Sequence, residues 1–272
     1  MFLSGANALM GGIDGRFDGH AHVFERSLPM YVHRRYTPHI DAPLARYLAH
    51  LAESNLQGGI LSQPSFLGSD NSFLLTSLAY ARHVEGVTLR GVAVLDPGAT
   101  QETLARLTAA GIIGLRLNLL GDAALQRFDL AQIKPLLKRV SDLGWHVEVY
   151  CEGRRLAELL PPLLEHCARV VVDHFGLPDP QDPLACPGQA AILKAPQDRL
   201  FVKTSAPYRV FRDLDTRDAV ESCGPIFRRL LDRLGPGHLL WGSDWPGTQF
   251  EDRYSFATTV EWERAWLSST VH

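Results

Sequence analysis

Residues 238–247 read HLLWGSDWPG, an apolar run followed by a glycine and then by serine, aspartate and proline. The apolar residues predict a short buried strand, and Pro246 prevents strand pairing from continuing. Gly242 has no side chain, so it allows another backbone segment to pass close by. The sequence therefore predicts a strand that ends in a carboxylate, Asp244.

Seven more apolar runs precede this one, and stretches with helical spacing of apolar residues lie between them. The eight runs cover residues 17–23, 58–63, 88–95, 114–119, 146–150, 169–173, 200–204 and 238–242. Eight strand–helix alternations in about 250 residues predict a single-domain (β/α)8 TIM-type barrel of the α/β class. We expect residues 1–16 to form a loose leader and residues 17–272 to form the barrel, with a Pro-rich loop and one short helix over 179–198.

The overall composition excludes several classes of protein. The chain has 272 residues, of which 46% are hydrophobic and 21% charged, with a formal net charge of −3. These values exclude a disordered chain and give no basic surface for nucleic acid or an anionic membrane. No apolar run approaches the roughly 20 residues that cross a bilayer. Neither a G-x-G-x-x-G nor a G-x-x-x-x-G-K-[ST] phosphate loop is present.

The cysteines and the beginning of the sequence indicate a cytoplasmic protein. Cys151, Cys167, Cys186 and Cys223 form no C-x-x-C pair, so we expect free thiols in a reducing compartment. The first residues lack the basic region of a signal peptide. We expect no nucleic-acid or membrane partner, and the sequence leaves a homodimer open.

Polar side chains stand where the predicted strands end, which is where catalytic residues lie in a barrel of this kind. One residue separates His20 from His22 in the first strand, so both side chains point to the same face. Together they can bind a metal or hold a substrate oxygen. His174 follows the sixth strand and Asp244 the eighth. An aspartate before a proline also caps turns, but the combination of four such positions favours catalysis.

An arginine, Arg116, lies inside the fourth apolar run, GIIGLRLN. Burying a guanidinium is unfavourable unless an anion meets it. That anion is either a substrate carboxylate, the alternative we favour, or a structural carboxylate such as Glu148 or Asp173.

Seven motifs occur in order between residues 17 and 247 and together resemble the amidohydrolase-related family that contains 2-pyrone-4,6-dicarboxylate lactonase. They are DGHAHVF, RRYTP, QPSFLGSDN, GIIGLRLN, LGWHVEVY, VVVDHFG and LLWGSDWP. The resemblance implies a distorted barrel that hydrolyses a small-molecule lactone. It implies that Asp244 is the general base on water, and that His20, His22 and His174 surround the scissile carbonyl. The substrate-contacting positions that it implies are Tyr36, Ser65, Arg116, Tyr150 and Arg209.

These roles agree with the chemistry of the reaction, which needs an activated water and donors for the developing oxyanion. Two positions depart from the family pattern, because Asp122 and Leu177 stand where relatives show arginine. The loss of two cations weakens the case for a dicarboxylate substrate unless Arg127 or Arg212 compensates. A monocarboxylate or a neutral sugar lactone is therefore equally compatible with the sequence.

The sequence favours catalysis without a metal or any other cofactor. Dinuclear zinc centres of the wider superfamily need a bridging Lys or Glu at strand four and a His at strand five, where this chain has Arg116 and Tyr150. A single zinc held by His20, His22, His174 and Asp244 is the alternative, as in a zinc-dependent hydrolase or decarboxylase. A catalytically silent ligand-binding barrel is a third reading.

Overall fold

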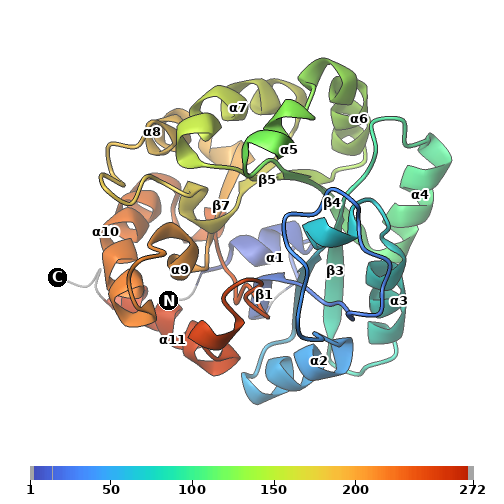
Figure 1. The fold of residues 1–272 in the computed structure, drawn as a ribbon, viewed down its shortest axis with the longest axis horizontal. Coiled ribbons are helices and arrows are strands. Elements are labelled where there is room, and N and C mark those ends of the chain that lie inside the picture. Colours follow the sequence, from blue (N-terminus) through green and yellow to red (C-terminus); the bar gives the residue numbers. More distant parts are fainter. Residues whose placement is uncertain (1–2, 14, 269–272) are drawn as a thin grey trace.

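The computed structural model describes residues 3–13 and 15–268, and it confirms the predicted (β/α)8 barrel. Eight parallel strands run in chain order around the centre, with helices outside them (Figure 1). The strands are β1 (Phe17–Ala21), β2 (Gly58–Ser62), β3 (Thr88–Ala93), β4 (Ile112–Asn118), β5 (His146–Tyr150), β6 (Val170–Val172), β7 (Leu200–Thr204) and β8 (Leu239–Trp241). Each one falls on a predicted apolar run.

The barrel closes at one seam, between β8 and β1. Seven neighbouring pairs form ladders, whereas β8 and β1 meet through the segment after β8: Asp244 N donates to His20 O at 2.8 Å and His22 N to Trp245 O at 2.7 Å. The two backbones approach so closely that a Cβ on Gly242 would lie 2.9 Å from the His20 Cβ. The predicted reason for Gly242 is therefore confirmed, and the seam accounts for the distortion that the resemblance implied.

Helices fill the connections between strands and cover the outside of the sheet (Figure 1). The long ones are α2 (Leu44–Glu53), α3 (Ser72–Ala81), α4 (Gln101–Ala110), α6 (Leu130–Asp142), α7 (Gly153–His166), α8 (Pro187–Lys194), α10 (Thr216–Leu234) and α11 (Phe256–Ser268). Short ones are α1 (Gly5–Leu9), α5 (Asp122–Gln126) and α9 (Pro207–Val210), with 3₁₀ turns η1 (Ser65–Leu67), η2 (His174–Gly176), η3 (Gln197–Arg199), η4 (Pro236–His238) and η5 (Glu251–Arg253). The helix predicted within 179–198 is α8.

The strands separate two apolar cores, because successive side chains of a strand point to opposite faces. One core lies between the sheet and the helices. The smaller core lies inside the barrel, on the side of the amino ends of the strands, and contains Phe17, Ile60, Val92, Val171, Phe201 and Leu240. Two residues further along three of these strands, the inward positions become polar: Ser62, Asp173 and Lys203. The change from an apolar floor to a polar layer places the chemistry at the carboxyl ends of the strands.

The segment before β1 is not the loose leader that we expected. Within it, α1 packs Ala6 and Leu9, together with Met10, against the apolar floor of the barrel. A Cβ on Gly5 would lie 2.5 Å from Leu239 O, so the helix touches the β8 backbone directly. Burial of apolar surface therefore makes this segment part of the packed fold. Of the predicted leader and barrel domain, residues 1, 2, 14 and 269–272 lie outside the described residues.

All four cysteines are buried and form no disulfide. Among the described residues, no helix combines the length and the apolar content needed to cross a bilayer.

Candidate active site

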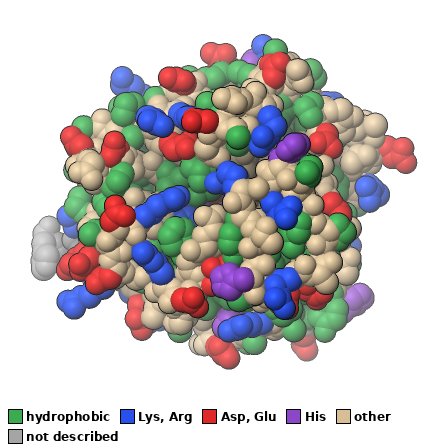
Figure 2. Space-filling model, viewed as in Figure 1, with side chains coloured by type: hydrophobic (Ala, Val, Ile, Leu, Met, Phe, Trp, Pro, Cys, Tyr) green, Lys and Arg blue, Asp and Glu red, His purple; other side chains and the backbone are tan. Residues whose placement is uncertain are grey.

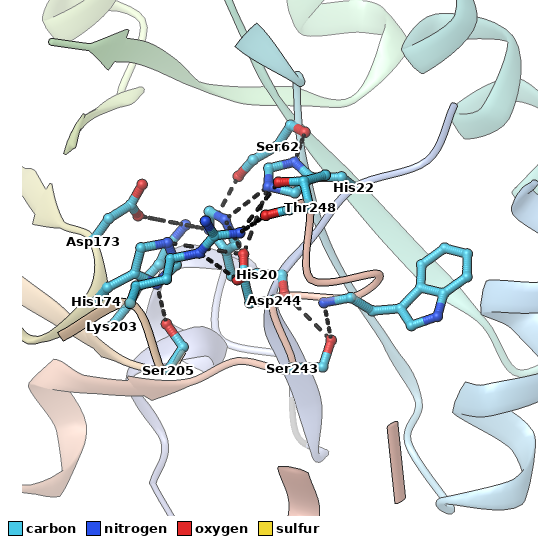
Figure 3. A network of polar contacts seen from close by, with 12 residues as sticks. His20, His22, Ser62, Asp173, His174, Lys203, Ser205, Ser243, Asp244 and Thr248 are labelled. Carbon is cyan, nitrogen blue, oxygen red and sulfur yellow. Dashed lines mark hydrogen bonds and ion pairs between the residues drawn. The ribbon is translucent and has the colours of Figure 1, made fainter. Parts of the chain in front are cut away.

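Three imidazoles and one carboxylate from distant parts of the sequence meet near the carboxyl ends of the barrel strands (Figure 3). Asp244 Oδ1 lies 3.6 Å from His20 Nε2, 3.8 Å from His22 Nε2 and 3.8 Å from His174 Nε2. All four side chains are buried. Asp244 and His174 both have left-handed backbones, with φ of 55° and 48°, a conformation that non-glycine residues adopt mainly where function requires it. The structure thus brings the four predicted catalytic residues together.

The two oxygens of Asp244 have different surroundings. Oδ2 accepts hydrogen bonds from Arg209 Nε at 2.6 Å and from the Tyr208 hydroxyl at 2.7 Å. Oδ1 has no hydrogen-bond partner among the described residues. Burial favours the neutral acid, but the Arg209 guanidinium outweighs burial and holds the pKa of Asp244 below its usual value. The carboxylate is therefore ionised and fixed at one oxygen, while the other is free to receive a proton.

The histidines are held in the neutral form by their surroundings. Burial lowers the pKa of His22 to about 3, and it also lowers the pKa values of His20 and His174 well below their usual range. Their second ring nitrogens are occupied: His22 Nδ1 contacts Ser62 O at 2.7 Å and His174 Nδ1 contacts Ser205 Oγ at 2.8 Å. Neutral imidazoles suit a site that polarises a carbonyl or orients water without trapping an anion.

A charged layer that sequence reasoning largely missed lies directly beneath these groups. Lys203 Nζ contacts Glu148 Oε2 and lies 3.3 Å from Asp173 Oδ1, and all three side chains are fully buried. Arg116 reaches the same carboxylates, at 3.6 Å from Glu148 Oε1 and 3.5 Å from Asp173 Oδ2. Only the inward alternation of LFVKT signals Lys203, because in isolation its letters resemble any β-strand with an exposed lysine.

A second missed residue, Asp18, clamps the seam next to Asp244. Asp18 Oδ1 accepts from Ser243 N at 2.8 Å and His20 N at 3.1 Å, and Oδ2 accepts from the Tyr47 hydroxyl at 3.2 Å. Asp18 therefore positions both the first histidine and the strand that carries the base. Its place in DGHAHVF, two residues before His20, was the available signal.

A pocket opens above the catalytic group and is lined by eight of the nine predicted site residues. Those eight are His22, Tyr36, Ser65, Arg116, Tyr150, His174, Arg209 and Asp244. His20 is fully buried beneath them and does not line the pocket. The Tyr150 hydroxyl and Arg116 Nε are buried and have no hydrogen-bond partner among the described residues, so they are available to a ligand. Tyr36 lies on the loop before α2 and donates its hydroxyl to Glu251.

Arg116 faces the structural carboxylates Glu148 and Asp173, and it also lines the pocket in which a substrate carboxylate would lie. The structural alternative and the substrate alternative are therefore compatible with each other.

Cations surround the mouth of this pocket (Figure 2). Arg35 and Arg212 line it, and among the described residues neither has a carboxylate within ion-pair distance. Arg212, one of the two arginines that we considered as compensation, is thus in place, whereas Arg127 lines a neighbouring hollow. Asp122 pairs with Arg155 at the surface, and Leu177 lines the outer recess next to the pocket. The pocket thus contains two arginines, Arg35 and Arg212, without an ion-pair partner among the described residues.

The donor atoms fit a single metal ion only in part. Ligand atoms of His20, His22 and Asp244 lie within 4.8 Å of one another, whereas His174 forms a second group with His20 and Asp173. His22 has the outer contact that a metal ligand needs, because its Nδ1 faces a carbonyl. His20 does not, because its Nδ1 faces the Lys203 ammonium at 2.6 Å. The residues present therefore do not complete a zinc site of the predicted four-ligand kind.

The chain is similar in sequence and in fold to several known proteins. A family model described as amidohydrolase matches residues 17–270. The chain is 28% identical to a 2-pyrone-4,6-dicarboxylate hydrolase of Comamonas testosteroni, over 88% of this chain and 79% of the relative. It is 24% identical to a 4-sulfomuconolactone hydrolase of Hydrogenophaga intermedia, over 88% and 77% of the two chains.

The fold is also similar to a solved structure from Acinetobacter baumannii, described as a "probable 2-pyrone-4,6-dicarboxylic acid hydrolase" with citric acid bound. The two share 30% identity with a TM-score of 0.84, and the match covers 93% of this chain and 92% of the other.

Proposed function

The chain belongs to the amidohydrolase family, and from this premise we propose that it hydrolyses a lactone that carries anionic groups, with Asp244 as the general base and without a metal. The observation that carries the proposal is Asp244 Oδ1, a buried carboxylate oxygen without a partner among the described residues, at the base of a pocket rimmed by arginines. Both curated relatives are named for lactones with anionic substituents, carboxylates in one and a sulfonate in the other.

The reaction is assigned to these residues as follows. Asp244 Oδ1 removes a proton from water as the water oxygen bonds to the lactone carbonyl carbon. The Tyr150 hydroxyl and Arg116 stabilise the oxyanion that forms. The ring C–O bond then breaks, and the proton held by Asp244 passes to the leaving oxygen. The product is an open-chain acid that has gained one water, and Asp244 returns to its ionised form.

The proposal is tested by a hydrolysis screen over pyrone carboxylates, muconolactones and sugar lactones, each with and without exhaustive chelation. We expect turnover of anionic lactones that is unchanged by the chelator. Activity that disappears with chelation and returns with zinc would replace metal-free hydrolysis by the mononuclear alternative, which the proximity of His20, His22 and Asp244 favours. If no lactone reacts while one of them raises the melting temperature, the protein is a binding barrel.

The pocket arginines are expected to select the substrate through its charge. Arg35→Gln and Arg212→Gln should each raise KM for a dianionic lactone about 10-fold or more, because each removes a charge-assisted hydrogen bond of about 1.5–3 kcal/mol. KM for a neutral sugar lactone should stay unchanged. Arg127→Gln is the matched control, because Arg127 lies outside this pocket. Equal effects on charged and neutral lactones would contradict the assigned role.

A further inference from the structure

Lys203 is a fully buried lysine in the middle of the barrel, and neither the family resemblance nor the proposed mechanism uses it. Its ammonium has three partners: Glu148 Oε2, Asp173 Oδ1 at 3.3 Å and His20 Nδ1 at 2.6 Å. These come from β5, the end of β6 and β1, so one cation joins three strands at the base of the site. Figure 3 shows Lys203 together with Asp173 and His20. A buried ammonium is retained only where such partners compensate it.

The contacts of Lys203 determine which nitrogen of His20 carries the proton. An ammonium has only donors, so at 2.6 Å it donates to His20 Nδ1, which must be unprotonated. Neutral His20 therefore carries its hydrogen on Nε2, and it donates that hydrogen to His22 Nε2 at 3.2 Å. His22 in turn carries its hydrogen on Nδ1, because it faces the Ser62 carbonyl at 2.7 Å. The series of hydrogen bonds from Lys203 through His20 and His22 to Ser62 is self-consistent, because every donor faces an acceptor.

This order is the opposite of what a metal requires of His20. A histidine that ligates through Nε2 carries its hydrogen on Nδ1 and donates it to a carboxylate, carbonyl or water. At His20 the nearest group to that position is an ammonium at 2.6 Å, which cannot accept a hydrogen bond. The oxygens that could accept one are farther from Nδ1: the Ser62 hydroxyl at 3.5 Å, Asp173 Oδ1 at 3.6 Å and Glu148 Oε1 at 3.8 Å. Changing the outer partner of a metal-bound histidine typically costs about 10–100-fold in metal affinity. Here the partner has the wrong polarity.

We propose that Lys203 is a positioning residue that takes the place of a metal: its ammonium compensates Glu148 and Asp173 and locks His20 in the Nε2–H form, which denies His20 to a metal ion. The inference rests on the proposed metal-free hydrolysis. Lys203 would then explain why this site, in which two histidines and an aspartate lie close together, does not bind a metal ion from solution.

The first test reads the tautomer in the unaltered protein. Ring-nitrogen NMR of protein labelled with ¹⁵N-histidine, with His20 assigned by loss of its signals in His20→Asn, should show Nδ1 unprotonated and Nε2 protonated. In Lys203→Met/Glu148→Gln, a pair that removes one charge of each sign, the His20 ring should lose this preference. Finding the hydrogen on His20 Nδ1 in the unaltered protein would overturn the proposal.

The second test measures zinc. After chelation and dialysis, titration of the unaltered protein should find no stoichiometric site, whereas Lys203→Met/Glu148→Gln should bind about one zinc per chain. Glu148→Gln alone, which keeps the lysine, is the matched control and should bind none. Adding His20→Ala to the double variant should abolish the site. Stoichiometric zinc in the unaltered protein, or none in a folded double variant, would refute the inference.

Neither readout involves a lactone, so the failure of this inference is distinguishable from failure of the proposed function. If the double variant does not fold, the tautomer of His20 in the unaltered protein still decides the question.

Discussion

Asp244→Asn should lower kcat for an anionic lactone by about two to four orders of magnitude, the usual contribution of a positioned general base. The amide keeps an oxygen that can accept from Arg209 and Tyr208, but it cannot take a proton from water. The fold should survive, because the shape of the side chain and its position at the seam are retained. Steady-state kinetics over a saturating range and a melting curve measure the two effects separately.

Asp122→Asn is the matched control for this prediction. The Asp122 carboxylate is also paired with an arginine, Arg155, but it lies at the surface and does not line the pocket. Its activity should equal that of the unaltered enzyme. If Asp244→Asn retained activity within about 10-fold, the base would be a different group, and the proposed proton path would be wrong.

The free energy of unfolding should fall steeply as the pH drops below about 6. His20, His22, His146 and His174 are buried as neutral rings with lowered pKa values, to about 3 for His22 and His146, so the unfolded chain binds four protons that the folded protein refuses. The stability that they contribute is present above the usual pKa of 6.5 and is lost as the pH falls below it.

Two carboxyl groups act in the opposite direction. Burial raises the pKa of Asp18 to about 6, and burial together with Glu148 raises the pKa of Asp173, so both hold protons in the folded state that the unfolded chain releases. Between about pH 6 and 5 the unfolded chain therefore binds a net of about two extra protons from these six groups, which lowers the free energy of unfolding by about 3 kcal/mol per pH unit.

Urea unfolding at a series of pH values from 4.5 to about 8 measures this slope through the linear dependence of stability on denaturant. His146→Leu should reduce the slope by about 1.4 kcal/mol per pH unit, because it removes one of the four refused protons. Replacing the exposed His83 by Asn is the matched surface control. Stability that is flat down to pH 4.5 would show that the buried histidines are charged in the folded protein.

Most of the architecture was predictable from the sequence because it depends on local patterns. Short apolar runs that alternate with amphipathic stretches specified eight strands, and every predicted run contains a strand within a few residues. The loose leader was the exception. The apolar residues of α1 are too few to predict a helix from the sequence. This helix is stabilised by packing against the apolar core inside the barrel, which six strands form.

The candidate site divides in the same way. The residues at the strand ends, His20, His22, His174 and Asp244, were found because a barrel places such ends around one rim. Lys203 and Asp18 were not found, because their roles depend on partners 55 and 225 residues away in the chain, Glu148 and Ser243. No local sequence pattern encodes which inward-facing side chain of one strand contacts which inward-facing side chain of another.

The sequence by itself thus determined the strand order, the rim and the identity of the groups that gather there, since these follow from periodicity and from the direction of parallel strands. Only the tertiary structure decided which oxygen of Asp244 is free, which nitrogen of His20 faces an ammonium, and which arginines reach the pocket. Those properties are set by side-chain distances of a few ångströms across a closed barrel, and burial then turns each such contact into a fixed charge or proton position.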